Sequence, residues 1–365
     1  MVAANVCKHL DRRRFDPLVL FFYQSTGSMP EILNNLGVES HGLEIMRRHI
    51  FIRPFIVASA LNRLGIDILH VHHVPLYNRV ANGLKLSRVK GVVLTEHAKY
   101  SISRSGRLQQ ASRRAAGSVN FFTTVSSNLK NFFTAELGIP EQSIQVIHNG
   151  IDTRRFAPGK GGDTLRSIIP RRRYDKILIN VGRLAEAKDH FTLLLMMKKL
   201  VQKDSNVILV LIGDGELRPA IEQKIEELSL ENHVFLLGSR ADVDDLMHQA
   251  DLFVLSSKRE GLPMVVLEAM ASGLPVVSTD VGGISEVVRN SENGALVPPE
   301  NPDRLAEAVQ RILSDPKLSG HMGTSARDWI VRHYSLDNIT KKYAALYRLI
   351  LDTAANPCPR QSRPE

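Results

Sequence analysis

Short apolar runs alternate with helical patterns along the first half of the chain. Residues 29–37, 53–65 and 128–138 carry apolar side chains at helical spacing and end in a glycine, a frequent C-cap residue. Because strand-like and helical segments alternate, the pattern predicts a parallel sheet with helices on both faces. The predicted buried strands cover residues 16–24, 67–73, 91–97, 120–127 and 144–150.

The second half repeats this alternation and predicts a second α/β domain with a doubly wound, Rossmann-like architecture. Its predicted strands cover residues 176–182, 206–215, 233–238, 251–257, 274–280 and 294–299. Its predicted helices cover residues 190–202, 216–229, 243–250, 263–272 and 302–315.

A Gly- and Pro-rich basic segment lies between the two halves and predicts a linker. We therefore expect a first domain over residues 1–157, a linker over 158–173 and a second domain over 174–337. A last helix at 338–353 can pack on either domain, for example back on the first, and the tail 354–365 has the composition of a disordered segment. Two such domains place a ligand cleft at the carboxyl ends of their strands.

The start of the first domain departs from the usual pattern. A doubly wound domain normally opens with a strand, a Gly-rich turn and a helix. Here residues 2–13 already have the pattern of the first helix and lead directly into the strand at 16–24. We therefore expect that the first strand and its Gly-rich loop are missing, through a late start codon or a truncation.

The composition is that of an ordinary soluble protein of a reducing cytoplasm. No run approaches the ~18–20 uninterrupted apolar residues of a membrane span, and the first residues do not form a signal peptide. Cys7 and Cys358 lie near opposite ends, which fits neither a zinc site nor a disulfide framework.

Positive charge is concentrated in the first part of the chain. Residues 1–160 hold 21 Lys and Arg against 10 Asp and Glu, a balance of +11, so the rest carries −2 of the total of +9. This favours an anionic partner or a solvated basic surface. Aromatic residues make up only 6% and are not interleaved with the basic ones, so nucleic acid is not expected. The basic run 99–114 favours a phosphate-bearing acceptor or peripheral contact with anionic lipid at the inner face of the cytoplasmic membrane.

Two acids, Glu260 and Glu268, bracket an apolar stretch in the second half. Gly261 and Pro263 exclude one continuous helix between them, and Pro263 fits the first position of a helix that Gly273 ends. The free N–H groups of such a helix bind anions, and Glu268 lies roughly 7 Å further along its axis, where a carboxylate suits a ribose diol. The alternative is a core element with two incidental acids.

Two cations follow another buried strand. Arg183 comes directly after Gly182, and Lys188 lies five residues further on at a predicted helix start. Together they can neutralise a diphosphate, Arg183 as a planar fork and Lys188 as a point charge, although either alone fits an ordinary basic loop. Gly213 marks a turn whose backbone can approach a ligand closely. The combination favours a site for a nucleoside diphosphate.

In four segments the chain resembles retaining glycosyltransferases of family 4. The resemblance rests on residues 146–158, 181–189, 211–218 and 260–288, and it runs from roughly residue 1 to 350. It implies the GT-B fold, with two Rossmann-like doubly wound domains facing each other across a cleft. It also implies transfer of a hexose from a nucleoside-diphosphate sugar to an acceptor hydroxyl with retention of configuration, as in bacterial surface polysaccharide or lipopolysaccharide assembly.

The resemblance also implies roles for individual residues. Glu260 would contact hydroxyls of the donor sugar and Glu268 would hold the ribose, while Arg183 and Lys188 would bind the diphosphate and help it leave. Amides of the helix start would lie near phosphate, and the loop at 238–240 would flank the base. The implied donor-binding residues besides Glu268 are Gly182, Gly213, Gly238, Arg240, Gly261, Leu262, Pro263, Met264 and Val265.

In the first half, the resemblance points to His97 as a residue close to the reacting sugar, although lone histidines at strand ends are usually structural. Alternation places His70 and His72 on one face of their strand and His73 on the other, with no carboxylate or cysteine spaced to complete a metal site. The acidic run 242–245 opens a helix and fits an N-cap cluster.

The implied donor is a UDP-, GDP- or ADP-sugar, of which we favour UDP, and the implied acceptor is a glycan or a polyprenyl- or other lipid-linked sugar. No metal is expected, because Arg183, Lys188 and the helix start would stabilise charge on the departing diphosphate. No carboxylate is placed for a covalent intermediate, which favours same-face attack. Two alternatives stay open: a sugar-nucleotide hydrolase or epimerase of the same fold, and a catalytically impaired nucleotide-sugar-binding protein.

Overall fold

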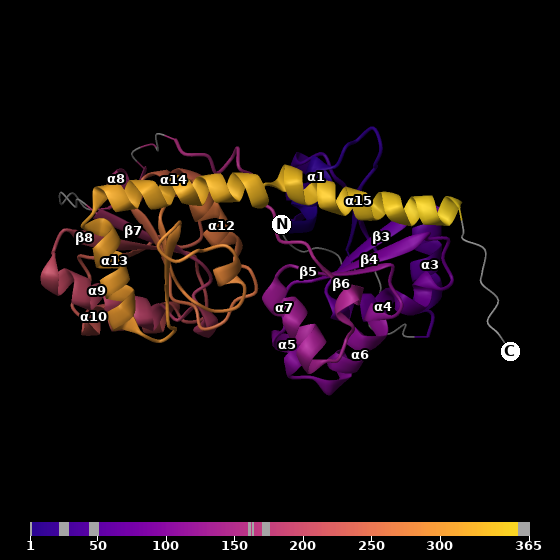
Figure 1. Cartoon of the computed structure of the whole chain (residues 1–365), viewed down its shortest axis with the longest axis horizontal. Coiled ribbons are helices and arrows are strands. Elements are labelled where there is room, and N and C mark those ends of the chain that lie inside the picture. Colours follow the sequence, from indigo (N-terminus) through magenta and orange to yellow (C-terminus); the bar gives the residue numbers. More distant parts are fainter. Residues whose placement is uncertain are drawn as a thin grey trace. The chain divides into compact units, whose positions relative to one another are not determined.

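The chain forms two compact units (Figure 1). The computed structural model describes residues 2–21, 29–43, 51–159, 162, 164–169 and 176–356. The first unit contains Met1–Gly150 and Leu336–Glu365, and the second contains Ile151–Ser335. Within the described ranges, no helix has both the length and the hydrophobicity needed to cross a membrane.

The first unit contains two parallel sheets. Strand β1 (Leu18–Phe21) pairs with β2 (Glu39–Gly42), and a separate sheet has the order β3-β4-β5-β6. All six residues of β4 are buried, as expected for a strand covered on both faces. The strands of the larger sheet are β3 (Ile68–His72), β4 (Gly91–Glu96), β5 (Phe121–Thr124) and β6 (Ile144–Val146).

Helix α15 (Leu336–Ala355) belongs to the first unit, although it follows the second unit in sequence. Its buried face, which includes Ile339, Tyr343 and Ile350, shares one core cluster with Val6 of α1 and Val93 of β4. The remaining helices of this unit are α1 (Val2–His9), α2 (Met29–Asn35), α3 (Arg53–Arg63), α4 (Val74–Leu84), α5 (Tyr100–Ser103), α6 (Gly106–Ala116) and α7 (Ser127–Asn131), with a π-helical turn η1 (Phe132–Glu136) and a 3₁₀ turn η2 (Glu141–Ser143).

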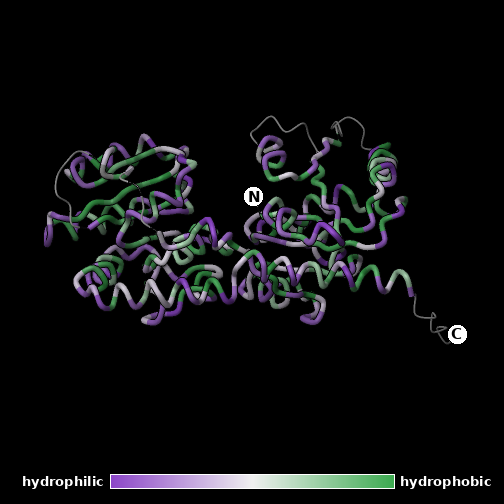
Figure 2. The backbone as a smooth tube through the Cα atoms, turned by 90° about the horizontal axis from the view of Figure 1, so that it is seen from above, coloured by the Kyte–Doolittle hydropathy of each residue, from purple (hydrophilic) through white to green (hydrophobic). Residues whose placement is uncertain are grey.

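The second unit is built on one six-stranded parallel sheet of order β12-β11-β10-β7-β8-β9. The order reverses between β7 and β10, which pair side by side. Figure 2 shows hydrophobic backbone segments through the interior of this unit, where the strands are almost entirely buried. The strands are β7 (Lys176–Val181), β8 (Val207–Ile212), β9 (Val234–Leu236), β10 (Leu252–Leu255), β11 (Val276–Thr279) and β12 (Gly294–Val297).

Helices cover this sheet and bring the loops at its carboxyl edge into place. Helices α9 and α13 share the main core cluster with the strands. The helical elements are α8 (Thr164–Ile168), η3 (Glu186–Lys188), α9 (His190–Lys203), α10 (Arg218–Glu227), α11 (Val243–His248), α12 (Met264–Ala271), η4 (Ile284–Glu286), α13 (Pro302–Leu313) and α14 (Pro316–His333).

Helix α12 begins one residue later than the sequence predicted. Pro263 has extended backbone angles and is the N-cap, so Met264 is the first helical residue. At the other end, Gly273 adopts a φ of 79°, and the amides of Gly273 and Leu274 bind the carbonyls of Met270 and Ala269. This is a Schellman motif, which ends the helix as the sequence predicted.

Several elements have no counterpart in the sequence prediction. Strand β2 and helices α4, α6 and α14 were not assigned from the pattern. Part of the expected linker forms α8, where Thr164 and Leu165 bind side chains of Asp245 and Gln249. In the expected tail, residues up to 355 belong to α15, and 357–365 lie outside the described residues, as do 22–24 of the first predicted strand. The absence of a strand ahead of α1 stays a prediction.

Candidate active site

The point where the strand order reverses is the expected ligand position in an open parallel sheet. In the second unit this point lies between the carboxyl ends of β7 and β10. The loop after β7 carries Lys188, and the loop after β10 carries Glu260. The two loops are joined by a hydrogen bond from the Lys258 amide to the Ala187 carbonyl, 2.9 Å long.

Lys188 and Glu260 form a direct ion pair across these loops. The Lys188 Nζ lies 2.6 Å from Glu260 Oε1, and the Ser257 hydroxyl donates to the same oxygen, also at 2.6 Å. The side chains are only 21% and 10% exposed, so each charge depends on the other for compensation. The carboxylate still has capacity to accept hydrogen bonds at Oε2.

The backbone beside Lys188 is held in place by Ser256. The Ser256 hydroxyl lies 3.0 Å from the Lys188 carbonyl and 2.8 Å from the Asp189 carbonyl. Asp189 has a left-handed conformation with a φ of 49°, and its buried carboxylate accepts a hydrogen bond from Thr192 at 2.7 Å. These contacts hold Lys188 against the end of β10, so its ammonium group is positioned before any ligand binds.

A third loop packs on the backbone of the Glu260 segment. Gly282 has a φ of 64°, and a Cβ at this position would overlap the Glu260 carbonyl oxygen. The Gly283 amide donates to the Gly261 carbonyl at 2.7 Å. A Cβ at Gly213, after β8, would likewise overlap the Gly182 carbonyl oxygen. Only glycine fits at positions 213 and 282, because a side chain there would push the site loops apart.

Helix α12 begins at Met264, at the end of the loop that carries Glu260, so its amino end belongs to this loop. Leu262 is buried, and Pro263 is the N-cap. The amides of Met264 and Val265 have no acceptor within the helix, as in the first turn of any α-helix. The helix dipole adds a partial positive charge there, so this end can bind an anion such as a phosphate.

Glu268 lies one turn further along α12 and differs electrostatically from Glu260. Burial raises its pKa to about 7; nearby Arg155 acts to lower the pKa, and Asp244 acts to raise it. Arg155 and Asp244 are themselves paired at 2.9 Å. The Glu268 carboxyl therefore changes protonation near neutral pH, and hydroxyl donors from a ligand would favour its ionised form.

Arg183 and Arg240 are held by other carboxylates. Arg183 lies 3.0 Å from Glu216 and is 73% exposed. Arg240 makes a forked pair with Asp242, at 2.8 and 2.6 Å, in the loop that follows Gly238. Asp242 occupies the N-cap position of α11, but its carboxylate binds Arg240 instead of a helix amide, which corrects the prediction of a capping cluster.

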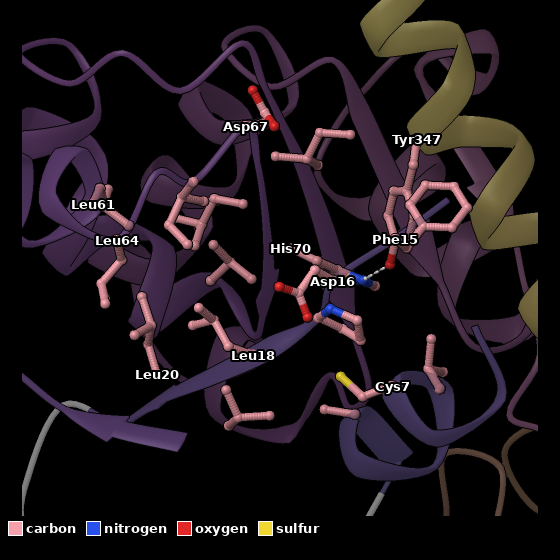
Figure 3. A pocket seen from close by; sticks show the side chains of 18 of the residues that line it. Cys7, Phe15, Asp16, Leu18, Leu20, Leu61, Leu64, Asp67, His70 and Tyr347 are labelled. Atoms are coloured by element: carbon pink, nitrogen blue, oxygen red, sulfur yellow. Dashed lines mark hydrogen bonds between the residues drawn. The ribbon is translucent and has the colours of Figure 1, made fainter. Parts of the chain in front are cut away.

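A second polar cluster surrounds His97 in the first unit. The His97 Nε2 and His72 Nδ1 are 2.9 Å apart, so one nitrogen donates to the other. The His72 ring stacks on the His70 ring with 4.4 Å between centroids, in agreement with the prediction that both share one face. His70 in turn lies 2.7 Å from the Tyr347 hydroxyl (Figure 3) and 2.7 Å from the Thr95 hydroxyl.

Burial keeps His97 uncharged at neutral pH. It lowers the His97 pKa to about 3, and repulsion from His72 and His73 adds to this effect. The neighbouring carboxylate of Glu96 is buried, yet hydrogen bonds from His73 and from backbone amides outweigh the burial and lower its pKa. His97 is thus a neutral imidazole beside a fixed anion.

Sequence reasoning missed three residues of these clusters. Ser257 holds Glu260, Arg155 lies near Glu268, and His72 is bonded to His97. The pair of serines at the end of the predicted strand 251–257 was the available signal for Ser257. No local pattern pointed to Arg155, which the sequence analysis placed in the first domain.

Comparison with known families gives these arrangements a context. Residues 1–155 match the family described as Glycosyltransferase Family 4, and residues 163–329 match Glycosyl transferases group 1. The chain belongs to glycosyltransferase family 4. Its two α/β units are those of the GT-B fold, and it is an enzyme of the glycosyltransferase class.

Individual relatives agree with this assignment. The chain is 29% identical over 299 residues to N-acetyl-alpha-D-glucosaminyl L-malate synthase of Bacillus anthracis, covering 81% of this chain and 78% of that protein. It is 26% identical over 310 residues to an Escherichia coli UDP-Gal:alpha-D-GlcNAc-diphosphoundecaprenol alpha-1,3-galactosyltransferase, with the same coverage of 81% and 78%. The solved structure of Anabaena HepE in complex with UDP superposes with a TM-score of 0.84 at 21% identity, covering 95% of each chain.

Proposed function

We propose that this glycosyltransferase moves a hexose from a UDP-sugar to a hydroxyl of a glycan or lipid-linked acceptor, with retention of the anomeric configuration. The observation that carries the proposal is the Lys188–Glu260 pair beside the start of α12. It combines a cation and helix amides for a diphosphate with a carboxylate for sugar hydroxyls.

The nature of donor and acceptor is supported by relatives. HepE was solved with UDP, and the Escherichia coli relative is named for a UDP-galactose donor and a diphosphoundecaprenol-linked acceptor. Both names describe those proteins, and we extend them to this chain as the proposal of a UDP-sugar donor and a lipid-linked glycan acceptor.

Each site residue has a role in this proposal. Lys188 and Arg183 bind the diphosphate and stabilise the charge that grows on it as the glycosidic bond breaks. Arg183 would exchange its pairing with Glu216 for the diphosphate. Glu260 accepts hydrogen bonds from the donor sugar, and Glu268 accepts them from the ribose diol. The acceptor hydroxyl attacks from the face that the diphosphate leaves, which preserves the configuration.

The loop residues bind the rest of the donor. Met264 and Val265 donate their amides to phosphate at the start of α12. Gly182, Gly213 and Gly261 allow backbone to approach the nucleotide closely. The segment from Gly238 to Arg240 flanks the base. His97 contributes a neutral imidazole on the side of the reacting sugar.

The central test is transfer by the Lys188→Ala variant with UDP-, GDP- and ADP-sugars and a polyprenyl-linked glycan acceptor. We expect turnover to fall roughly 10²- to 10³-fold, because charge on the leaving diphosphate loses its cation. The matched control is Lys199→Ala, since Lys199 forms an exposed pair with Asp303 in the same unit. An unchanged rate for Lys188→Ala would sink the assignment. Donor loss without acceptor glycosylation would instead indicate a hydrolase.

We also propose that the basic part of the first unit contacts anionic lipid. Arg104, the C-cap of α5, and Arg107 of α6 are exposed, and the Arg104 guanidinium lies 4.3 Å from the centre of the Tyr100 ring. A basic residue near an anionic membrane contributes about 1 kcal/mol to the binding free energy. Reversing both charges should therefore weaken binding to anionic vesicles at least roughly tenfold.

Flotation with phosphatidylglycerol vesicles tests this contact. The variant carries Arg104→Glu and Arg107→Glu, and the control is Arg304→Glu, an exposed residue paired with Glu307 in the second unit. Equal binding of the variant and the wild type, or binding to neutral phosphatidylcholine vesicles, would contradict a charge-dependent contact.

A further inference from the structure

A partly buried guanidinium joins three segments of the second unit. Arg327 of α14 donates from Nη1 to the carbonyl of Ala271, at the carboxyl end of α12, and to the carbonyl of Phe156, at 2.7 and 2.9 Å. Its Nη2 donates to the carbonyl of Thr153 at 2.9 Å. Because one nitrogen binds both Ala271 and Phe156, the end of α12 and the turn at 153–156 are held together directly.

The Arg327 charge is used to bind backbone. In the described ranges its guanidinium binds carbonyl oxygens and no carboxylate. Burial lowers the Arg327 pKa, because a partly desolvated cation is less stable than one in water. The free carbonyls at the end of a helix attract a cation, which offsets part of this penalty. An arginine here therefore serves to join the two backbones that it binds.

Helix α14 also approaches the end of α12 through its backbone. A Cβ at Gly323, four residues before Arg327, would overlap the carbonyl oxygen of Gly273, the residue that ends α12. Residues four apart lie on one face of a helix, so Gly323 and Arg327 face the end of α12 together. A Cβ at Gly273 would in turn lie 3.2 Å from the side chain of Pro158, which follows the turn. Backbone packing thus brings the same three segments together.

The turn itself is fixed by internal hydrogen bonds. The Asp152 carboxylate accepts from the amides of Arg154 and Arg155, at 3.0 and 3.2 Å. The Phe156 amide donates to the Asp152 carbonyl at 3.0 Å, and the Phe156 side chain is buried. The direction in which the Arg155 side chain leaves the turn is therefore set by these contacts and by Arg327.

Arg155 and Glu268 are the charged groups that depend on this junction. The Arg155 guanidinium donates to Asp244 of α11 at 2.9 Å and to the Ala241 carbonyl at 3.0 Å. Glu268 lies on α12, three residues before Ala271, and burial raises its pKa to about 7. Among the charged groups of the described elements around α12, Arg155 lowers this pKa and Asp244 raises it. The ionisation of Glu268 thus depends on where Arg155 is held.

We propose that Arg327 is a positioning residue of the donor site, which keeps Glu268 able to bind a ribose diol by holding the Arg155 turn against the end of α12. An ionised carboxylate can accept hydrogen bonds from both hydroxyls of a diol, whereas protonation removes part of this capacity. Arg327 itself contacts no ligand and acts through Arg155. This role rests on the proposed function, in which Glu268 binds the ribose of a UDP-sugar.

The first test measures the Glu268 pKa in the full chain by NMR titration of labelled glutamate carboxyl groups, with Glu268→Gln to assign the signal. In Arg155→Gln the pKa should rise from about 7 to about 8, because a nearby cation that favours the ionised form is lost. Arg327→Gln should give a similar rise. The double variant should give no further rise, because Arg327 acts through Arg155.

The matched control is Arg332→Gln, which should leave the Glu268 pKa unchanged. Arg332 also lies on α14, but its side chain is 73% exposed and pairs with Asp328. If Arg327→Gln does not fold, Arg327→Lys replaces it. Lysine keeps the charge but lacks the planar fork, so it should raise the Glu268 pKa less, in the same direction. No rise in the folded variant, or additive rises in the double variant, would overturn the positioning role and leave the proposed function intact.

The second test compares the binding of UDP-glucose and of an analogue with deoxyribose in place of ribose, by calorimetry at pH 7 and pH 9. At pH 7 Arg327→Gln should lose roughly fivefold of the wild-type preference for ribose, because the ionised fraction of Glu268 falls from about one half to about one tenth. At pH 9 the two proteins should show the same preference. A loss of equal size at both pH values would indicate a merely structural role and overturn the inference. A wild type without any preference for ribose would overturn the ribose role of Glu268 as well.

Discussion

At the scale of single residues, the carboxylates of Glu260 and Glu268 have different surroundings. Glu260 is partly buried but is compensated by Lys188 and Ser257. Glu268 is partly buried along α12, and this burial outweighs the nearby Arg155, so its pKa rises to about 7. Protonation of Glu268 is therefore coupled to folding.

Replacing Glu268 with glutamine should remove a pH dependence of stability. The folded protein holds the Glu268 proton up to about pH 7, while the unfolded chain releases it near the ordinary glutamate pKa of 4.5, so wild-type stability falls as pH rises through this window. Above pH 7, Glu268→Gln should be more stable than the wild type by up to about 3 kcal/mol, and the difference should vanish near pH 4.

Urea unfolding at pH 4, 6 and 8 measures this difference. The control is Glu307→Gln, since Glu307 is exposed and paired with Arg304. If the Glu268→Gln and Glu307→Gln variants show the same pH dependence as the wild type, Glu268 does not titrate in this window.

At the scale of elements, the site is formed by loops whose backbones touch. The loops after β7, β10 and β11 meet through Ser256, through the Lys258–Ala187 hydrogen bond and through Gly282. The short α12 is fixed at its carboxyl end by the Schellman motif at Gly273. Lys188 and Glu260 are thus positioned by loop packing and by one helix.

Gly282→Ala should disturb this packing more than an ordinary glycine replacement. Gly282 has a positive φ, and its new Cβ would overlap the Glu260 carbonyl, so we expect a loss of about 2 kcal/mol or more in stability and a lower rate of transfer. The matched control is Gly320→Ala within α14, where no atom lies within 4 Å of the added Cβ. It should raise stability by roughly 0.5–1 kcal/mol. Equal effects of the two substitutions on unfolding would contradict the loop-packing argument.

At the scale of the whole molecule, the two units respond differently to acid. The first unit holds His70, His72 and His97 partly buried and uncharged, and burial lowers the pKa of His70 and of His97 to about 3. In the second unit, the lowered pKa of His190 and the raised pKa of Glu268 have opposite consequences between pH 5 and 7. Acid sensitivity is therefore concentrated in the first unit.

Lowering the pH from 7 to 5 should destabilise the first unit. In the unfolded chain these imidazoles bind protons below about pH 6.5, whereas in the folded protein they do not. The free energy of unfolding therefore decreases as the pH is lowered, by about 2 kcal/mol for each of His70 and His97 at pH 5. His73 acts in the opposite direction, because its hydrogen bond to Glu96 raises its pKa. Hydrogen exchange should show lost protection in β3–β5 and little change in β7–β8. Equal losses in both units would contradict this assignment.

Much of the fold could be predicted from the sequence, because the signals are local. Apolar runs such as 207–212 and 276–279 indicated buried parallel strands, and proline and glycine marked the bounds of α12 within one residue. Helix α14 was missed because its glycines and polar residues weaken the helical pattern, although packing against α12 and α13 stabilises it in the structure.

The sequence by itself determined the two α/β halves and the presence of the two acids beside a proline-initiated helix. The tertiary structure decided that Lys188 neutralises Glu260 from 72 residues away, that Arg155 lies near Glu268 and that His72 is bonded to His97. It also decided that the described strands of the first unit form two separate parallel sheets. The physical reason is that strand and helix patterns depend on neighbours a few residues apart, whereas ion pairs, protonation and cavities depend on which distant elements pack together.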